Sequence, residues 1–429
     1  MSFKIEKNRI KEDRSRSAVL WGRVLSCALI VYIAYGLAIY WFKASFIIYG
    51  SINHWSFSEF MINYEGGFVR RGLLGEITFQ ICKITGADAR YFISVFSILI
   101  YSTLFYYFWN KFRIYHIRWW FLASPLLFGF LDSVVRKDFL MGWMYIWMCM
   151  LLKSNHSSIV KRCWAICIAI IGLLIHEAFI FWGVPMVILL LWDNRKKYIS
   201  ILAISILIVL FGILCHYRGN LIIVNGIIES WNNRLDLNPP LEVTVNAVGA
   251  LLWNAGETFE THIKNNIGYK FHCMGLFIRP IVAFFAYYLI INFIKIFKGK
   301  NVKYEETDRT NIGAVYIFVS LCMIPMFTIL SNDYARLYQY IGIASVGAFI
   351  TLDSNRIAGV FPRRFLLFVE RFNQKIDRLL PTSKGWYIFI FLLWGAAPGY
   401  YDANEALQLS VVGKLAVLLG SVVKLICFD

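Results

Sequence analysis

Residues 198–215 read YISILAISILIVLFGILC, eighteen consecutive residues without a charged side chain. This length and composition are typical of a helix that crosses a lipid bilayer, which needs about 20 mostly apolar residues. The whole chain has the same character, because 59% of its 429 residues are hydrophobic, only 16% are charged and the mean hydropathy is +0.59. Such a composition excludes an ordinary soluble protein.

Further apolar stretches predict an all-α, polytopic membrane protein with about 11–12 membrane helices in one domain, residues 1–429. Two of these stretches are interrupted by polar residues but begin and end at basic segments, so each predicts a short hairpin: 119–152 and 163–192. We expect the other helices over about 19–41, 90–110, 198–215, 274–296, 312–330, 337–352 and 386–397. The segment 408–427 either spans the membrane or lies at its interface.

The distribution of basic residues orients these helices. Most of the 43 Lys and Arg residues occur in six groups, at 4–16, 111–118, 153–162, 195–197, 295–309 and 356–384. The positive-inside rule assigns the N-terminus and these groups to the cytoplasm. A basic surface beside anionic lipid accounts for the net charge of +17 without a nucleic-acid partner.

The same rule predicts which connecting segments face outward. Outer loops cover about 42–89 and 216–273, whereas a basic cytoplasmic loop covers about 353–385 and contains an amphipathic surface helix. The conspicuous polar motifs then fall on the outer side or at the tips of the two hairpins. The arms of those hairpins are too short to reach the far surface, so their charged tips should line a water-filled cavity that opens outward.

The first outer loop contains the sequence YEGGFVRRGLLGE, in which Glu65 is an acid close to paired glycines and adjacent arginines. The paired glycines Gly66 and Gly67 would let the backbone approach a ligand, and the adjacent Arg70 and Arg71 offer forked donors for phosphate. The alternative is an interfacial helix whose arginines pair with lipid headgroups.

The tip of the first hairpin carries Asp132, Arg136, Lys137 and Asp138. Charges at membrane depth are costly, so these residues mark either a substrate path or a structural ion pair. We count Asp132 and Asp138 as candidate catalytic carboxylates, and Arg136 and Lys137 as candidate substrate-binding cations.

The tip of the second hairpin carries His176 and Glu177 inside a long apolar run. A His beside a carboxylate could deprotonate or orient an acceptor hydroxyl, so both are candidate catalytic residues. Adjacent residues on a helix point about 100° apart, which argues against a shared metal ion. The alternative is a buried His that is satisfied by a neighbouring carbonyl group.

A short outer turn carries Asp333, Arg336 and Tyr338. A carboxylate, an arginine and an aromatic ring together suit a sugar, whose hydroxyls need paired donors and acceptors and whose apolar face stacks on rings. A local ion pair that closes the turn explains the same residues. The cluster of motifs on one face, more than any single member, indicates a functional site.

These features fit a polyprenyl-(di)phosphate-linked saccharide, whose tail lies in the bilayer and whose phosphate binds arginine. The sequence has no phosphate-binding P-loop or dinucleotide fingerprint. Its nine cysteines are scattered singly, which predicts neither a disulfide framework nor a metal site. No cofactor is therefore expected, although a divalent metal ion is left open.

The outer motifs around Glu65, Arg70 and Arg71, the turn at Asp333 and Arg336, and the order of helices resemble Wzy-type O-antigen and capsular polysaccharide polymerases. More loosely, they resemble GT-C glycosyltransferases. The resemblance implies an inner-membrane enzyme with a periplasmic active face, a bound undecaprenyl-(di)phosphate-linked glycan, and other polysaccharide-assembly proteins as partners. By position, it also implies that Glu65 is the catalytic base and that Arg70 and Arg71 clamp the phosphate. The alternatives are a transferase that adds one sugar from undecaprenyl phosphate and a transporter or flippase for a lipid-linked glycan.

Overall fold

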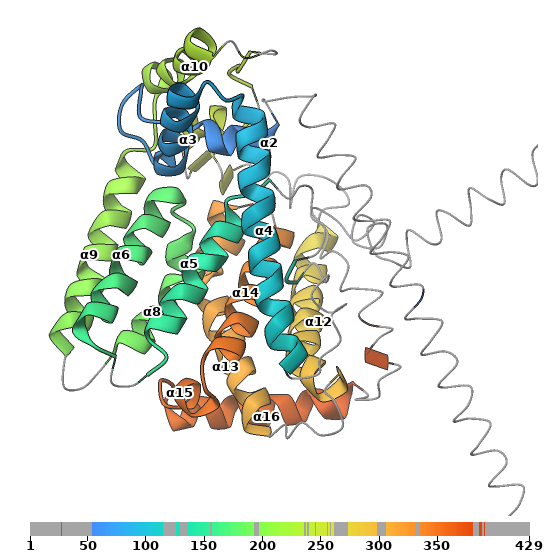
Figure 1. Ribbon diagram of the computed structural model, residues 1–429. Helices are drawn as coiled ribbons and strands as arrows, with labels where there is room; N and C mark the ends of the chain where they lie inside the picture. Colours follow the sequence, from blue (N-terminus) through green and yellow to red (C-terminus); the bar gives the residue numbers. More distant parts are fainter. Residues whose placement is uncertain are drawn as a thin grey trace, which may run out of the picture.

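The computed structural model describes residues 54–114, 126–128, 135–154, 157–192 and 197–380, apart from short gaps at 236, 238–239, 245, 255, 258, 261–272, 298–305 and 332–333, and a few single positions beyond them. Every regular element in these residues is helical (Figure 1). The all-α class predicted from the sequence is therefore confirmed for the described part of the chain.

The helices differ widely in length. The α-helices are α2 Trp55–Ser58, α3 Gly72–Thr85, α4 Ala89–Ile114, α5 Asp138–Leu151, α6 Ile159–Ile175, α7 Phe179–Trp182, α8 Val184–Leu191, α9 Lys197–His216, α10 Leu221–Leu235, α12 Cys273–Phe297, α13 Glu306–Cys322, α14 Tyr334–Thr351, α15 Ser354–Ala358 and α16 Arg363–Leu379. Short 3-10 turns form η1 Glu59–Met61 and η3 Gly249–Leu252, and a π-helical turn forms η5 Met326–Leu330.

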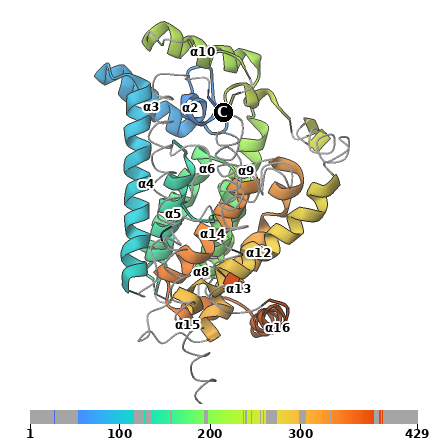
Figure 2. The same cartoon turned by 90° about the vertical axis from the view of Figure 1, so that its right-hand side faces the viewer.

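The long helices form a bundle with α9 at one side and α12 at the other in Figure 1, and α4 lies along one edge after a quarter turn (Figure 2). The elements α2, α3 and α10 cover one end of this bundle. The opposite end is crossed by α16, which is seen end-on after a quarter turn (Figure 2). The predicted outer segments 42–89 and 216–273 are thus not plain loops, because they contain α3 and α10.

The interruption at His176 produces the hairpin that the sequence predicted. Helix α6 begins after Ser158, whose side chain caps Lys161 N–H, and it ends at His176, where the backbone becomes extended. The chain returns through α7 and α8. Arg162 Nη1 donates to the carbonyl oxygen of Leu191 at 3.1 Å, so the start of α6 and the end of α8 lie together.

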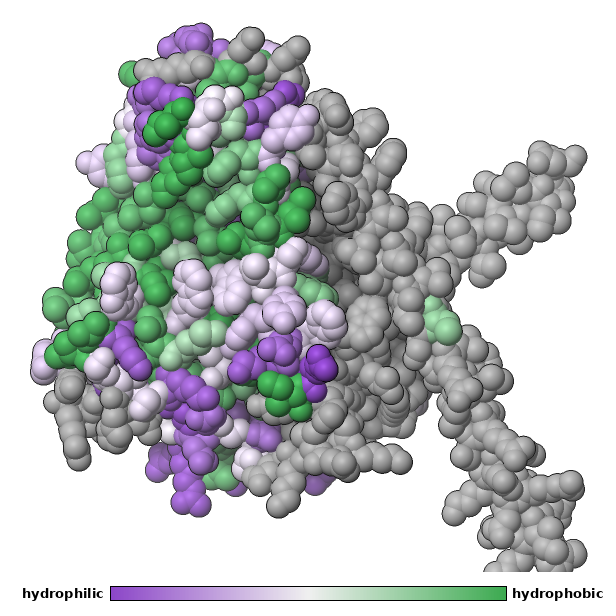
Figure 3. Space-filling view, viewed as in Figure 1, coloured by the Kyte–Doolittle hydropathy of each residue, from purple (hydrophilic) through white to green (hydrophobic). Residues whose placement is uncertain are grey.

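Two of the described helices are long and apolar enough to cross a membrane: α4 and residues 198–216 of α9. Only 28% of the apolar window of α4 and 22% of that of α9 are buried, whereas a core helix of a soluble protein is mostly buried. Figure 3 shows apolar side chains in a band across the bundle, with hydrophilic side chains toward both ends. These features are consistent with membrane association.

Several predicted helix boundaries agree with the structure, and others lie outside the described residues. The segments 90–110, 198–215, 274–296 and 337–352 correspond to α4, α9, α12 and α14. The predicted segment 312–330 differs, because α13 ends at Cys322 and η5 completes it. The segments 19–41 and 408–427, most of 386–397 and the first arm of the hairpin at 119–152 lie outside the description.

The end of the bundle crossed by α16 carries several of the basic groups. Arg309 of α13 donates to both carboxylate oxygens of Asp377 on α16, at 2.7 and 2.6 Å. Lys153, which follows α5, pairs with Asp353 at 3.3 Å. These contacts bring basic segments that are distant in sequence to one end of the bundle.

Candidate functional site

Five parts of the chain meet near the other end of the bundle and form a buried cluster of charged side chains. The turn before α3 supplies Arg70 and Arg71, the start of α5 supplies Arg136, Lys137 and Asp138, the break after α6 supplies His176 and Glu177, and α14 supplies Arg336 and Tyr340. Glu59, on η1, completes the set, which we call the charged cluster.

At one side of the charged cluster, Arg71 contacts both Glu177 and Lys137. Its Nε lies 3.0 and 2.9 Å from the two carboxylate oxygens of Glu177, and its Nη2 lies 2.5 Å from Oε1. Its carbonyl oxygen accepts a hydrogen bond from Lys137 Nζ at 3.0 Å. Burial alone would lower the pKa of Arg71, but the Glu177 carboxylate outweighs burial and raises it.

The backbone of Arg71 has a positive φ of 66°. No other non-glycine residue in the described part of the chain has a positive φ. A positive φ is costly for a residue with a Cβ, and such conformations concentrate at functional sites. Here it turns the Arg71 carbonyl toward Lys137 while the side chain reaches Glu177. The contacts of the charged cluster thus hold an unfavourable backbone conformation.

At the other side of the charged cluster, Arg336 contacts both Asp138 and Glu59. Its Nε and Nη2 donate to Asp138 at 2.6 and 2.8 Å, and its guanidinium contacts Glu59 at 3.2 Å. Burial favours the neutral acid of Glu59, but the nearby positive groups, Arg336 foremost, together outweigh burial and hold the pKa of Glu59 below its usual value. Glu59 also accepts a hydrogen bond from Trp55 Nε1.

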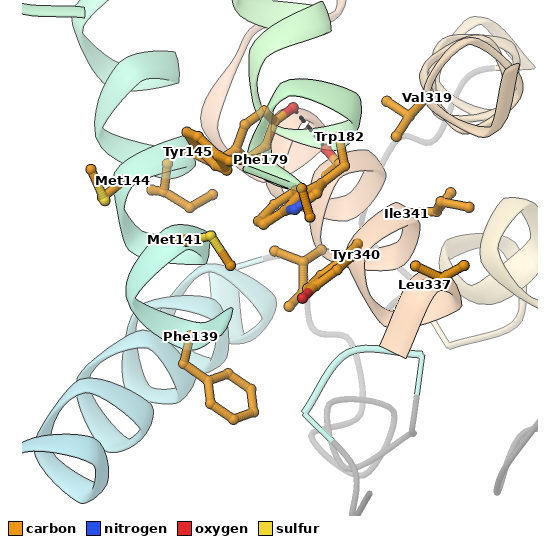
Figure 4. Close-up of a cluster of buried hydrophobic side chains, with 14 of the residues drawn as sticks. Phe139, Met141, Met144, Tyr145, Phe179, Trp182, Val319, Leu337, Tyr340 and Ile341 are labelled. Carbon is orange, nitrogen blue, oxygen red and sulfur yellow. Dashed lines mark hydrogen bonds between the residues drawn. The ribbon is translucent and has the colours of Figure 1, made fainter. Parts of the chain in front are cut away.

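Tyr340 fixes Asp138 from the apolar side, since its hydroxyl donates to Asp138 Oδ1 at 2.6 Å. The ring of Tyr340 stacks on Trp182 with centroids 4.8 Å apart and planes inclined by 6° (Figure 4). Trp182 comes from α7, the helix directly after the break at His176. No sequence pattern pointed to Tyr340 or Glu59, because neither lies in a polar motif.

The charged cluster has more positive than negative charge. Five cationic side chains, Arg70, Arg71, Arg136, Lys137 and Arg336, surround the three carboxylates of Glu59, Asp138 and Glu177. His176 adds no charge here, because its Nδ1 accepts the N–H of Ala178 at 3.1 Å. The cations therefore exceed the carboxylates by two charges, which makes the charged cluster a candidate site for an anion.

The charged cluster opens to the surface at Arg70, Arg71 and Glu177. Their side chains are 20%, 17% and 14% exposed, whereas those of Asp138 and Glu59 are 0% and 2% exposed. A ligand that enters from outside would therefore meet Arg70, Arg71 and Glu177 first.

Gly66 and Gly67 were expected to let the backbone approach a ligand, but in the structure they lie against another part of the protein. A Cβ on Gly66 would lie 2.3 Å from the carbonyl oxygen of Ile223, so the backbone that approaches Gly66 is that of α10 and not that of a ligand. Gly67 has a φ of 121°, which only glycine adopts readily, and it faces the Ile223 side chain. Both glycines therefore serve turn geometry and packing.

Two further predicted residues lie apart from the contacts of the charged cluster. Glu65 is exposed, and its backbone N–H donates to Asn63 Oδ1. Tyr338 is buried, and its ring packs 5.3 Å from that of Phe327, which leaves no open face for a sugar. Asp132 and Asp333 lie outside the described residues.

Metal ligation finds no support in the described part of the chain, where no group of three His, Cys, Asp or Glu side chains could hold an ion. Comparisons with known proteins add no assignment, since no family model, curated protein or solved structure matches this chain. Function must therefore be argued from the charged cluster itself.

Proposed function

We propose that this chain is a multi-pass, periplasm-facing glycosyltransferase of the bacterial inner membrane that polymerises O-antigen or capsule repeat units carried on undecaprenyl diphosphate. The observation that carries this proposal is the charged cluster, in which five cations surround three carboxylates. A buried excess of positive charge favours a ligand with several negative charges, and a diphosphate has them.

The apolar outer faces of α4 and α9 support a lipid-linked substrate. A prenyl chain can lie in the bilayer along such helices while its diphosphate reaches the charged cluster at one end of the bundle. The basic groups near α16 lie at the other end, and the positive-inside rule would turn that end toward the cytoplasm. The charged cluster would then face the periplasm.

The proposed reaction is the transfer of a glycan between two lipid-linked units. A hydroxyl oxygen of the acceptor sugar attacks the anomeric carbon of the donor, the bond from that carbon to the diphosphate oxygen breaks, and undecaprenyl diphosphate leaves. The cations stabilise the charge that develops on the leaving diphosphate. We assign the hydroxyl proton to Glu177, because it is the carboxylate of the charged cluster that is partly exposed.

The location of the charged cluster also bears on the alternatives. A transporter has to present its substrate site to both sides of the membrane in turn, whereas the exposed members of this charged cluster lie beside the start of α3 and the end of α6. A GT-C-type transferase that adds a single sugar shares the expected chemistry, so the product must separate it from a polymerase.

The deciding experiment is deletion of the gene followed by electrophoresis of the surface polysaccharide. A polymerase predicts that the deletion strain carries one repeat unit on its lipid core, and that the wild-type gene restores the ladder. A complete ladder in the deletion strain contradicts the proposal. A repeat unit that lacks one sugar would identify the single-sugar transferase, and loss of all repeat units would favour the transporter.

Glu177→Gln tests the assigned proton acceptor, and Glu65→Gln serves as the comparison, because Glu65 is the base that family resemblance implies. We expect Glu177→Gln to abolish the ladder when polymer is measured per unit of inserted protein, and Glu65→Gln to preserve it. The reverse result would transfer the catalytic role to Glu65.

A further inference from the structure

A row of aromatic rings begins beside the charged cluster, where α9 ends. The rings of Tyr64 and Phe68 stack with centroids 5.4 Å apart, Phe68 meets Tyr217 edge-on at 5.3 Å, and Tyr217 meets His216 edge-on at 5.1 Å. Phe68 is 40% exposed and Tyr217 is 46% exposed. This row, which we call the aromatic shelf, therefore has open ring surface.

Arg70 is joined to the aromatic shelf through its backbone. Its N–H donates to the carbonyl oxygen of Tyr217 at 2.9 Å. Its side chain is less well satisfied, because its Nε is buried without a hydrogen-bond partner and its nearest carboxylate, Glu177, is 3.6 Å away and already bound by Arg71. Arg70 therefore has donors left for a ligand.

Arg218 follows Tyr217 directly and is exposed. Within the described part of the chain, it has no ion-pair partner. Its charge acts on Arg70, whose pKa is lowered mainly by burial and further by the nearby charges of Arg71 and Arg218. The backbone bond from Arg70 to Tyr217 thus brings together two arginines, of which Arg218 is exposed and Arg70 has only a long contact with a carboxylate.

We propose that Arg70 and Arg218 together bind the diphosphate of a prenyl-linked glycan, and that Phe68 and Tyr217 pack against the first sugar ring. This inference rests on the proposed function, but it moves the diphosphate contact from the pair Arg70 and Arg71 to the pair Arg70 and Arg218. Two arginine forks match the two phosphates. Exposed rings match the apolar face of a pyranose.

Packing of α10 keeps the two arginines together. A Cβ on Gly226 of α10 would lie 2.7 Å from the Cα of Gly66, so the two backbones are in close contact. The turn from α9 into α10 includes Gly219, which has a φ of 108° and packs on Leu251 and Val69. Arg218 is thus held next to the turn that carries Arg70.

Arg218 has a simpler explanation, since a cation after a helix C-terminus is favoured by the helix dipole and at a membrane surface by phospholipid headgroups. Lysine serves both of those roles, whereas it loses the fork that grips a diphosphate. The substitution Arg218→Lys therefore separates the explanations, beside Arg218→Gln and the control Arg364→Gln on exposed α16.

The experiment measures the Kd of farnesyl diphosphate for the purified full-length chain in nanodiscs of phosphatidylcholine, with farnesol as the uncharged comparison. We expect Arg218→Gln to raise the Kd about ten- to a hundred-fold and Arg218→Lys to raise it by nearly as much. Farnesol binding should stay unchanged in all variants, and Arg364→Gln should match the wild type. Inorganic diphosphate should compete with farnesyl diphosphate.

Three results would overturn the inference: an unchanged Kd in Arg218→Gln, equal losses for farnesol, or displacement of farnesyl diphosphate by phosphatidylglycerol at equal concentration. These results are independent of the gel that tests the proposed function. A single-repeat phenotype in the deletion strain, together with an unchanged Kd in Arg218→Gln, would contradict the proposed arginine pair but not the polymerase. A complete polysaccharide ladder in the deletion strain, together with weakened binding in Arg218→Gln, would contradict the polymerase but not the proposed arginine pair.

Discussion

Arg71 and Glu177 are separated by 106 residues, yet the guanidinium Nε of Arg71 lies 2.9 Å from Glu177 Oε2. The pair joins the turn before α3 to the break after α6, and both partners are mostly buried. Removing one partner of such a pair leaves the other charge buried without compensation. Adjacent Arg70 has a longer contact with the same carboxylate, so the two neighbouring arginines should respond differently to substitution.

The first prediction compares Arg71→Lys with Arg70→Lys. Arg71→Lys should lower the free energy of unfolding by about 1.5–3 kcal/mol, because lysine cannot bind Glu177 through two donors. Arg70→Lys should leave Tm near the wild-type value and lower polymer output about ten- to a hundred-fold. Thermal unfolding in detergent and polymer per unit of inserted protein measure the two effects, with Lys83→Arg as control. Equal Tm losses in both variants would refute the division of roles.

The second prediction concerns the hydroxyl of Tyr340, which donates to the buried carboxylate of Asp138. Tyr340→Phe keeps the ring on Trp182 but removes a hydrogen bond to a charged group, so it should cost about 1.5–3 kcal/mol. The matched control is Tyr387→Phe, which loses a bond from a buried hydroxyl to the carbonyl oxygen of Leu289 and should cost about 0.5–1.5 kcal/mol. Chemical unfolding of both variants tests this order, and a larger loss in Tyr387→Phe would contradict it.

The third prediction uses two helical glycines with opposite surroundings. A Cβ on Gly75 of α3 would lie 1.8 Å from the carbonyl oxygen of Ile62, whereas a Cβ on Gly212 of α9 would meet nothing within 4 Å. Gly75→Ala should therefore destabilise the protein by at least about 1–3 kcal/mol. Gly212→Ala should be neutral or stabilise it by about 0.5–1 kcal/mol. Measured Tm values that fall equally in both variants would show that the close approach at Gly75 is not required.

The fourth prediction concerns the attachment of α16. Asp377 accepts two hydrogen bonds from Arg309, whose side chain is buried and otherwise pairs with the exposed Glu306. Asp377→Asn should weaken this attachment by about 1.5–3 kcal/mol and increase protease cleavage within α16. Glu370→Gln, on the same helix, provides the comparison. Unchanged cleavage in Asp377→Asn would mean that other contacts hold α16.

The fifth prediction is topological. In a variant that lacks the nine native cysteines, Glu65→Cys should react with a membrane-impermeant reagent added outside once the outer membrane is opened. Arg364→Cys, on α16, should react only after lysis. Both positions are exposed in the fold, so burial does not explain a difference between them. Labelling in the opposite order would overturn the periplasmic assignment of the charged cluster.

The sequence predicted the elements that depend on local pattern. An apolar run without charge predicted α9, the polar interruption at His176 predicted the break after α6, and the basic amphipathic pattern predicted α16. Within the candidate site, the polar motifs pointed to Arg71, Glu177 and Arg336, because charged residues stand out in an apolar chain. The sequence did not show that the backbone of Gly66 packs against Ile223 on the distant helix α10, or that Tyr338 is buried against Phe327 of the preceding turn η5.

The sequence by itself determined the helical class and the positions where helices break, since both follow from the local spacing of apolar and polar residues. Only the tertiary structure decided which charges meet. Glu59 pairs with Arg336 across 277 residues, and Arg70 meets the carbonyl of Tyr217 at the end of α9. Such pairings depend on how whole helices pack, and a buried charge in a helical bundle is stabilised by whatever partner that packing brings to it.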